Sequence, residues 1–229
     1  MIVRRQSSAF VLISQPDHAR LSGSIAAAVG NETFAPPSPL DLVIAAADRH
    51  DDGWAAADAH PALDNTGAPR HVFATPVEAS IPIWSASTQM AISRNPYCGL
   101  LVSLHGMHLS LAASAASPQQ VFQINRFQHE QVEIQEQLRR QLGMHTDRPL
   151  HFGLATDSLL PEEELLKFNF RLLQLFDVVS LNLCFDELRL PHLANILPRP
   201  GASPVTAEIR RLAPDEFSVK PWPFAQNDL

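Results

Sequence analysis

Apolar residues recur every three or four positions through most of this chain, which is the spacing that buries one face of an α-helix. Asp17 after Pro16 is a good helix cap, and Gly30 is a natural helix stop. The pattern predicts helices over residues 17–30, 40–50, 97–113, 118–142 and 161–186. The apolar stripe over 118–142 is sparse, so we expect the opposite face of that helix to lie in solvent.

The two ends of the chain have a strand-like pattern. Residues 1–5 and 9–15 are rich in alternating or β-branched apolar positions and predict a hairpin. A second hairpin is predicted near the other end, over 206–213 and 216–224. We therefore predict one mainly α-helical domain over residues 1–229. Segments near 1–15 and 205–220 are expected to form one small β-sheet.

A long stretch between the predicted helices lacks a regular period. Residues 52–84 are rich in Asp, Gly and Pro and are predicted to be an irregular connection. Loops of that length inside a domain are usually functional or disordered. Trp54, Phe73 and Trp84 favour an ordered connection, because large aromatic side chains need packing partners.

Composition narrows the partners of the chain. Its 229 residues are enough for one domain with a full core. The formal net charge is −7 and no basic run occurs, which argues against nucleic acid or an anionic membrane as the main partner. A small-molecule substrate is the alternative, and a homodimer is left open.

Membrane insertion and secretion are not expected. No uninterrupted apolar run approaches the ~18 residues of a membrane-spanning helix. The apolar run near the start is too short for a signal peptide, and Gln15 and Pro16 follow it. Cys98 and Cys184 lie far apart in apolar surroundings, which predicts buried free thiols in a reducing, cytoplasmic compartment.

Polar residues interrupt several of the apolar helices. His18 lies in the first predicted helix, His50 and Asp51 close the second, and His105 and Asp177 lie inside later ones. A buried, unpaired charge costs several kcal/mol, so such groups need partners or a metal ion. Imidazole and carboxylate ligands suit Fe, Mn, Zn or Co. One or two such divalent ions would compensate all five side chains together.

Each position also has a simpler interpretation. A single histidine at a helix end is often only hydrogen-bonded, and Asp177 has Arg126 or Arg171 as potential partners. The remaining histidines are assigned to loops or polar faces: His60, His129, His145, His151 and His192. The order of the polar residues, rather than any one of them, favours the metal site.

That order resembles the HD-domain superfamily of metal-dependent phosphohydrolases. In that superfamily a first His, an adjacent His-Asp pair and a distant Asp bind a metal within a helical core. The resemblance implies His18, His50, Asp51 and Asp177 as ligands. Members with two metals use further histidines and a bridging aspartate. This implies a ligand or catalytic role for His105 beside Asp51, with His71 and His108 as weaker candidates.

More closely, the chain resembles a bacterial family filed as domain of unknown function 3891. The shared segments are "MIVRR", "QPDHARLSG", "HDDGW", "LLVSLHG", "FDVVSLNLC" and "PWPF". The resemblance implies an HD-like bundle and its site but no established activity. One departure concerns the segment after the His-Asp pair. Many HD hydrolases have an apolar-Gly-Lys segment there, whereas Asp52, Gly53 and Trp54 stand here and remove a lysine that would contact phosphate.

Neighbours of the proposed ligands are further candidates. Trp54 is placed to wall a pocket, and Asp52 adjoins the ligand pair. Gln15 and Arg20 flank His18 closely enough to orient a ligand or touch an anionic substrate.

Three functions remain open from the sequence. The first is a metal-dependent hydrolase, in which the ion activates water. The second is a diiron oxygenase on an HD fold, for which the ligand series would be His18, His50, Asp51, His71, His105 and Asp177. The third is a non-catalytic helical domain that binds a ligand.

Overall fold

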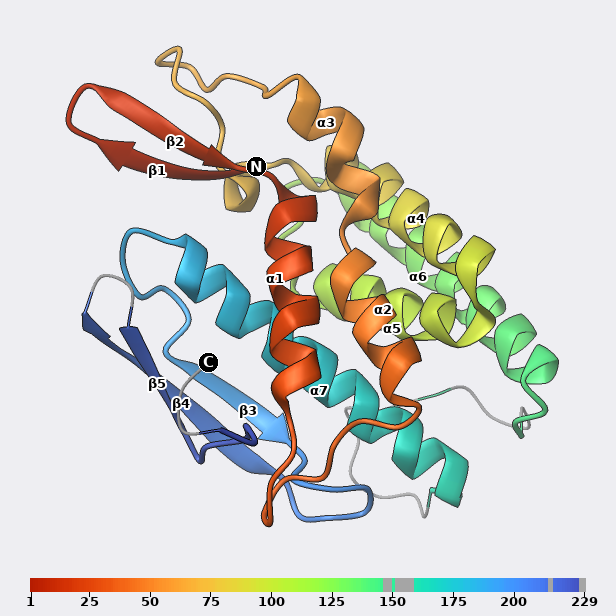
Figure 1. Cartoon of the computed structure of the whole chain (residues 1–229). Coiled ribbons are helices and arrows are strands. Elements are labelled where there is room, and N and C mark those ends of the chain that lie inside the picture. Colours follow the sequence, from red (N-terminus) through yellow and green to blue (C-terminus); the bar gives the residue numbers. More distant parts are fainter. Residues whose placement is uncertain (146–149, 151–158, 214–215, 227–229) are drawn as a thin grey trace.

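Helices carry most of the chain, and small antiparallel sheets lie near its two ends (Figure 1). The computed structural model describes residues 1–145, 150, 159–213 and 216–226. The helices and short 3-10 turns are α1 (Gln15–Ala28), α2 (Leu40–Arg49), η1 (Asp52–Trp54), α3 (Ala55–Ala59), η2 (Val72–Ala74), α4 (Val77–Arg94), α5 (Pro96–Ala112), α6 (Pro118–Gln141) and α7 (Pro161–Cys184). The strands are β1 (Ile2–Gln6), β2 (Ala9–Ile13), β3 (His192–Ile196), β4 (Val205–Ala213) and β5 (Glu216–Lys220). The prediction of a mainly helical fold is confirmed.

Polar caps followed by proline define where several helices begin. At the start of α5 the Asn95 side chain accepts a hydrogen bond from the Tyr97 backbone N–H. At the start of α6 the Ser117 side chain accepts one from the Gln120 backbone N–H. Proline suits the first turn because the backbone N–H groups there have no helical acceptor, so the lack of an N–H in proline loses no hydrogen bond. At α1 the cap is Ser14, not Asp17 as predicted, since the Ser14 side chain accepts from the Asp17 backbone.

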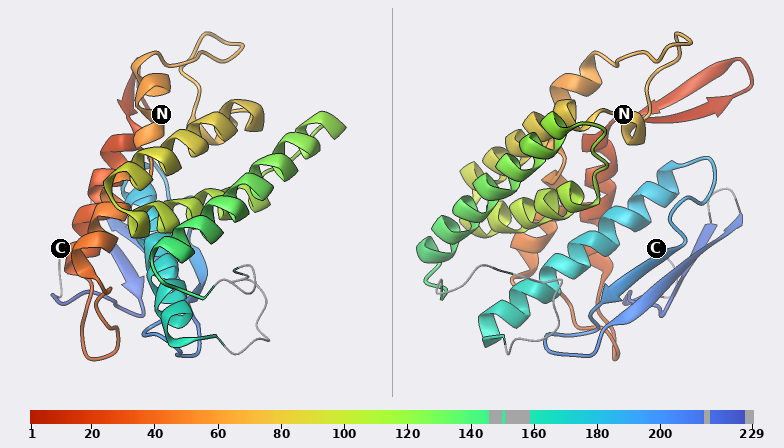
Figure 2. Two further views of the ribbon diagram at one scale, coloured as in Figure 1. Left: turned by 90° about the vertical axis from the view of Figure 1, so that its right-hand side faces the viewer. Right: turned by 180° about the vertical axis from the view of Figure 1, so that it is seen from behind.

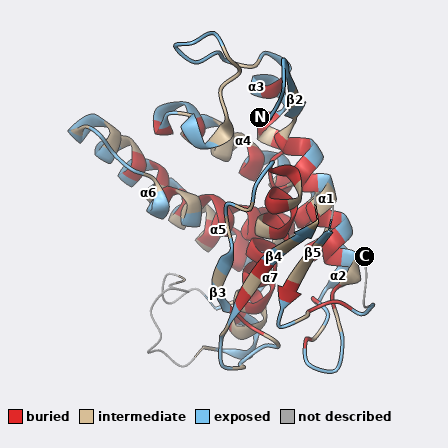
Figure 3. Ribbon diagram, turned by 90° about the vertical axis from the view of Figure 1, so that its left-hand side faces the viewer, coloured by how far each residue is buried: buried red, intermediate tan, exposed pale blue. Residues whose placement is uncertain are grey.

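Helix α7 lies at the centre of the fold and packs against α1, α2 and α5. Its buried side chains occupy almost its whole length, including Leu166, Phe168, Leu172 and Phe176 (Figure 3). By contrast, one end of α6 extends away from the other helices (Figure 2). The predicted solvent face of α6 is observed only in part, because Gln131 and Gln135 are buried and both bond to Ser103 of α5. The buried polar residues on α7 also need a local explanation.

The prediction of one sheet shared by both ends is wrong. Strands β1 and β2 pair only with each other, and β3, β4 and β5 form a separate sheet. The cause is α1, which follows β2 directly and carries the chain about 21 Å over its 14 residues. The chain beyond β5 meets the far end of that helix, where the Gly30 backbone donates to Pro223 O at 3.0 Å.

The prediction that residues 52–84 lack regular structure is also wrong. They contain η1, α3 and η2, and α4 begins at Val77. The buried side chains of α4 are mostly small or polar: Val77, Ser80, Ser87, Thr88 and Ala91. Pro82 also lies inside this helix. A helix that buries serine and threonine has no apolar stripe, so its period is invisible to a hydrophobic pattern.

Both cysteines behave as predicted. Cys98 and Cys184 are free and buried. Burial raises the pKa of both thiols, that of Cys184 to about 11, which suits packing rather than reactivity. No helix in the described part of the chain is both long enough and apolar enough to cross a bilayer.

Candidate metal centre

Three helices and the junction between α2 and η1 bring five polar side chains to one buried place. His18 comes from α1, His50 ends α2, Asp51 precedes η1, His105 comes from α5 and Asp177 from α7. Each of the five is at most 9% exposed. These five side chains are called the His-Asp cluster below.

The spacing of four donor atoms in the cluster matches a shared ion. His18 Nε2 lies 3.0 Å from Asp51 Oδ2 and 3.7 Å from Asp177 Oδ1. His50 Nε2 lies 3.7 Å from the same Asp51 oxygen and 3.4 Å from the same Asp177 oxygen. Ligands about 2.1 Å from a metal are about 3.0 Å apart in an octahedral site and about 3.4 Å apart in a tetrahedral one. These four nitrogen–oxygen separations lie in the range expected between neighbouring ligands of one ion, and the donor atoms of His18, His50 and Asp51 form one group that could hold it.

His105 extends the cluster on one side. Its Nε2 lies 3.8 Å from Asp177 Oδ2, whereas the other oxygen of that carboxylate faces His18 and His50. The His50 and His105 rings meet edge to face with centroids 5.1 Å apart. The donor atoms form two overlapping groups, His18–His50–Asp51 and His50–His105–Asp177, that could hold a metal ion.

Hydrogen bonds at the outer ring nitrogens orient two of the histidines. His50 Nδ1 lies 2.8 Å from Ala47 O, a pure acceptor, so it carries the hydrogen. His18 Nδ1 lies 2.9 Å from Ser180 Oγ, which itself donates to the Asp177 backbone carbonyl. His50 Nε2 then presents a lone pair to the carboxylates, which is repulsive unless a proton or a metal lies between them. His18 Nε2 lies at hydrogen-bond distance from Asp51 Oδ2.

A buried atom without a partner supports this fit. His50 Nε2 is inaccessible to solvent and has no hydrogen-bond partner among the described residues, and the same holds for His105 Nδ1. Buried polar atoms are normally satisfied, and exceptions often mark a missing ion or water. The Nε2 of His50 is the atom that a metal would satisfy.

The charges in the cluster favour cation binding. Burial lowers the pKa of His50, but the Asp51 and Asp177 carboxylates outweigh it and raise this pKa to about 9. Burial works against ionisation of both carboxylates, yet the surrounding histidines hold their pKa values below the usual range. Burial lowers the pKa of His105 to about 4, so this ring is neutral near pH 7. Without a metal, a proton on His50 compensates the paired carboxylates.

Gly53 lets the segment that follows the His-Asp pair lie directly against α4. A Cβ at this position would be 2.3 Å from Ile83 O and 2.6 Å from Ser87 N, both backbone atoms. The Gly53 backbone also donates to Ser87 Oγ at 3.0 Å. This close contact fixes η1 and thereby the side chains on either side of it, Asp51 and Trp54.

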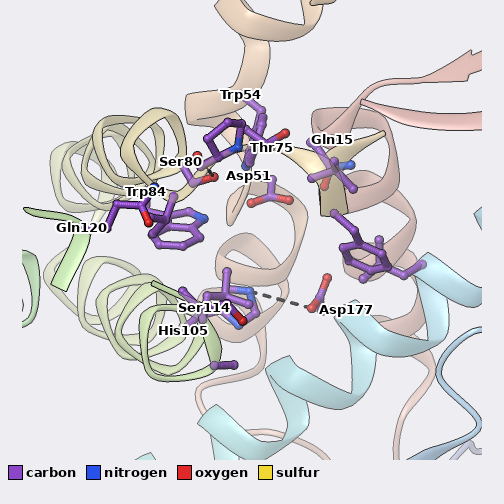
Figure 4. Close-up of a pocket in the computed structure, with 18 of the residues that line it drawn as sticks. Gln15, Asp51, Trp54, Thr75, Ser80, Trp84, His105, Ser114, Gln120 and Asp177 are labelled. Atoms are coloured by element: carbon purple, nitrogen blue, oxygen red, sulfur yellow. Dashed lines mark hydrogen bonds and ion pairs between the residues drawn. The ribbon is translucent and has the colours of Figure 1, made fainter. Parts of the chain in front are cut away.

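A cavity of about 470 Å³ opens onto the cluster. Asp51, His105 and Asp177 line it (Figure 4), whereas His18 and His50 are not among its lining residues. Trp54 and Trp84 form part of its wall. The volume is typical of small-molecule sites.

Two of the weaker ligand candidates do not join the cluster. His71 Nδ1 accepts from the Phe73 backbone, and the ring packs against Phe185. Burial, then Arg189 and the N-terminal amino group, lowers the pKa of His71 to about 4. His108 faces Phe170, with ring centroids 6.1 Å apart. Neither ring belongs to the two donor groups.

Of the four candidates that flank the proposed ligands, two line the cavity and two pair with charged residues elsewhere. Gln15 and Trp54 line the cavity. Arg20 is exposed and pairs with Asp17 on the same helix. Asp52 lies 3.6 Å from Arg49 and 3.8 Å from Arg94, away from the donor groups.

The remaining histidines give no further cluster among the described residues. The exposed ones are His60, His129, His145 and His192. His151 lies outside the described residues.

The sequence reasoning missed the residues that support the histidines. Ser180 bonds to His18, and Ser22 lies 2.7 Å from Ser180, oxygen to oxygen. Ser22 follows His18 by four positions and Ser180 follows Asp177 by three, which places each pair on one helix face. That spacing was a usable signal. No sequence signal placed Trp84 at the site, because it lies on α4, which the hydrophobic pattern did not predict.

Comparison with known proteins gives a family without an activity. No curated protein and no solved structure gives a significant match to the chain. The family model described as "Protein of unknown function (DUF3891)" matches residues 1–229. The chain therefore belongs to the DUF3891 family of proteins of unknown function.

Proposed function

We propose that this protein is a metal-dependent hydrolase of a small molecule, with the ligand order of an HD domain. The observation that carries the proposal is the 3.0–3.7 Å separation of the His18 and His50 ring nitrogens from the Asp51 and Asp177 carboxylate oxygens. Their order along the chain, His, His-Asp and a late Asp, is the order of HD phosphohydrolases. The helical core around them supports an HD-like bundle.

Each residue has a role in this proposal. His18, His50, Asp51 and Asp177 hold one ion of Fe, Mn, Zn or Co, and His105 supplies a further nitrogen to it or to a second ion. Such an ion lowers the pKa of a bound water towards about 7 and polarises the bond under attack. Because Asp51 lines the cavity, its carboxylate can accept a proton on the substrate side. His18 and His50 are shielded from substrate and only bind metal.

Hydrolysis ranks above oxygenation because of His71. The six-ligand series of a diiron oxygenase needs this histidine, but its Nδ1 accepts from the Phe73 backbone and its ring packs on Phe185. A purely ligand-binding domain ranks lower as well, since three cluster residues line a cavity of substrate size. A cytoplasmic location belongs to this proposal, supported by the two free cysteines, and it is compatible with a homodimer.

The test is hydrolysis by protein loaded with Mn(II), Fe(II) or Zn(II), followed over a panel of esters and phosphate esters. Asp51→Asn is expected to abolish turnover, whereas Asp52→Asn is the matched control because its carboxylate faces Arg49 and Arg94. Turnover that survives Asp51→Asn, or that needs oxygen and iron, contradicts the proposal.

A further inference from the structure

The cavity over the His-Asp cluster has an unusual charge balance for a phosphohydrolase. Its ionised carboxylates are Asp51 and Asp177, and the described residues that line it include no lysine or arginine. Sites for phosphate esters generally add arginine or lysine to the metal, because the transferred group carries up to two negative charges.

The first turn of α4 does not replace the missing cations. Val77 and Ser80 from this turn line the cavity, and helix N-termini attract anions. However, Glu78 lies in the same turn, and its carboxylate accepts from Gln120 Nε2 at 2.9 Å. Gln120 is itself part of the wall. A carboxylate beside the helix start offsets its partial positive charge.

The rest of the wall suits an apolar or aromatic group. Trp54 and Trp84 line the cavity (Figure 4), and Leu109 and Leu181 are also part of its lining. Two of the chain's three tryptophans are thus in this one place. Binding of an aromatic or apolar ligand group against such walls removes apolar surface from water, which favours association.

A neutral polar group lies at the same wall. Gln15 is 3% exposed and lines the cavity, and its Nε2 has no hydrogen-bond partner among the described residues. A side-chain amide offers a ligand hydrogen-bonding groups that carry no charge, so this part of the wall suits a neutral polar group.

We propose that the cavity binds an uncharged carboxylic ester whose aromatic or apolar group packs against Trp54 and Trp84. This inference rests on the proposed hydrolase function. Its carbonyl lies towards Asp51, His105 and Asp177. In the reaction the water oxygen bonds to the carbonyl carbon and the C–O ester bond breaks. The leaving alkoxide takes the proton that the water loses, so the products are a carboxylic acid and an alcohol.

The test compares ligands that share one aromatic group but differ in charge. Calorimetry on the metal-loaded protein measures binding of the uncharged N-(1-naphthyl)acetamide and of 1-naphthyl phosphate. Hydrolysis of 1-naphthyl acetate and 1-naphthyl phosphate is measured on the same sample. The uncharged amide is expected to bind at least about 10-fold more tightly than the phosphate, and the acetate to be the better substrate.

Variants of the cavity wall test its contribution to ligand binding separately from that of the metal. Trp84→Ala is expected to weaken amide binding by about 10-fold or more, while Trp222→Phe, which changes a tryptophan outside the cavity wall, leaves it unchanged. Ser114→Lys places a cation at the exposed rim of the cavity and is expected to improve phosphate binding.

Each outcome bears on one proposal or the other. Tighter binding and faster hydrolysis of the phosphate overturn the uncharged substrate but leave a metal-dependent hydrolase standing. Binding of the amide without hydrolysis of either ester supports the substrate class and counts against the hydrolase. Failure of both naphthyl ligands to bind overturns the inference.

Discussion

His18 Nδ1 and Ser180 Oγ lie 2.9 Å apart, although the two residues are separated by 162 positions in the chain. This hydrogen bond joins α1 to α7 and turns the other ring nitrogen of His18 towards Asp51 and Asp177. It connects the packing of the helical core to the geometry of the proposed metal site.

Removing that hydrogen bond is expected to weaken the site without removing a ligand. Ser180→Ala should lower metal affinity by about 10- to 100-fold, since the partner of a metal-bound histidine fixes its orientation and tautomer. Titration with Zn(II) against a competing chelator measures the effect. Ser24→Ala, on the exposed side of α1, should leave affinity unchanged. Equal affinity in the two variants would show that Ser180 does not position His18.

Gly53→Ala is expected to destabilise the fold and to disturb the site together. The added Cβ would lie closer than 3.0 Å to backbone atoms of α4, so one of the two segments must shift, and such overpacking typically costs about 1–3 kcal/mol. Urea unfolding measures stability, and metal content measures the site. Gly106→Ala on α5 is the control, because its Cβ would meet nothing closer than 3.5 Å. A Gly53→Ala protein as stable as the control would contradict the described contact.

The raised pKa of His50 predicts proton release on metal binding. This group holds its proton up to about pH 9 in the folded protein, against 6.5 for an ordinary histidine. Its stabilisation of the metal-free fold is complete below pH 6.5 and is lost as pH rises through about 9. A metal must displace the proton, so its affinity should rise over the same range.

Two measurements check this pH dependence. Calorimetry at pH 7.5 in buffers of different ionisation enthalpy should report release of about one proton from His50 per ion. The increase in Tm on adding Zn(II) should be larger at pH 9 than at pH 7. Binding with no proton release, or a metal-induced Tm shift that shrinks as pH rises, would contradict the assignment of His50 as a ligand.

His71→Ala is expected to leave metal content unchanged, because this ring packs on Phe185 outside both donor groups. His105→Ala should reduce metal content or affinity, because His105 shares the group with His50 and Asp177. Elemental analysis of the two variants purified side by side makes the comparison. Loss of iron from the His71→Ala variant would favour the diiron oxygenase over the hydrolase.

The sequence predicted the cluster better than its surroundings. His18, His50, Asp51, His105 and Asp177 stand out as polar residues in apolar segments, and the cost of burying them alone predicts that they meet. The structure brings them together within one buried region. Ser22 and Ser180 could have been predicted only from their spacing to His18 and Asp177 along one helix face. The cavity wall could not be predicted, because part of it lies on α4, which the hydrophobic pattern does not mark.

Where the fold prediction failed, tertiary contacts decided the outcome. Helix α4 buries Ser80, Ser87 and Thr88, so a hydrophobic period does not mark it. Hairpin patterns at the two ends predicted β1, β2, β4 and β5, although the predicted second strands run on to residues 15 and 224 instead of ending at 13 and 220. Strand β3 was not predicted. Which strands share a sheet depends on where α1 carries the chain, and local patterns contain no such information.

The content of bound metal tests the central claim most directly. Elemental analysis of protein purified without chelator, or reloaded with Mn(II), Fe(II) or Zn(II), is compared with His50→Ala and Asp177→Asn variants whose folding is checked by circular dichroism. The wild-type protein is predicted to retain at least about one equivalent of a transition metal, and both variants to lose most of it. A wild-type protein that binds no metal after reloading, or folded variants that bind as much as the wild type, would contradict the account.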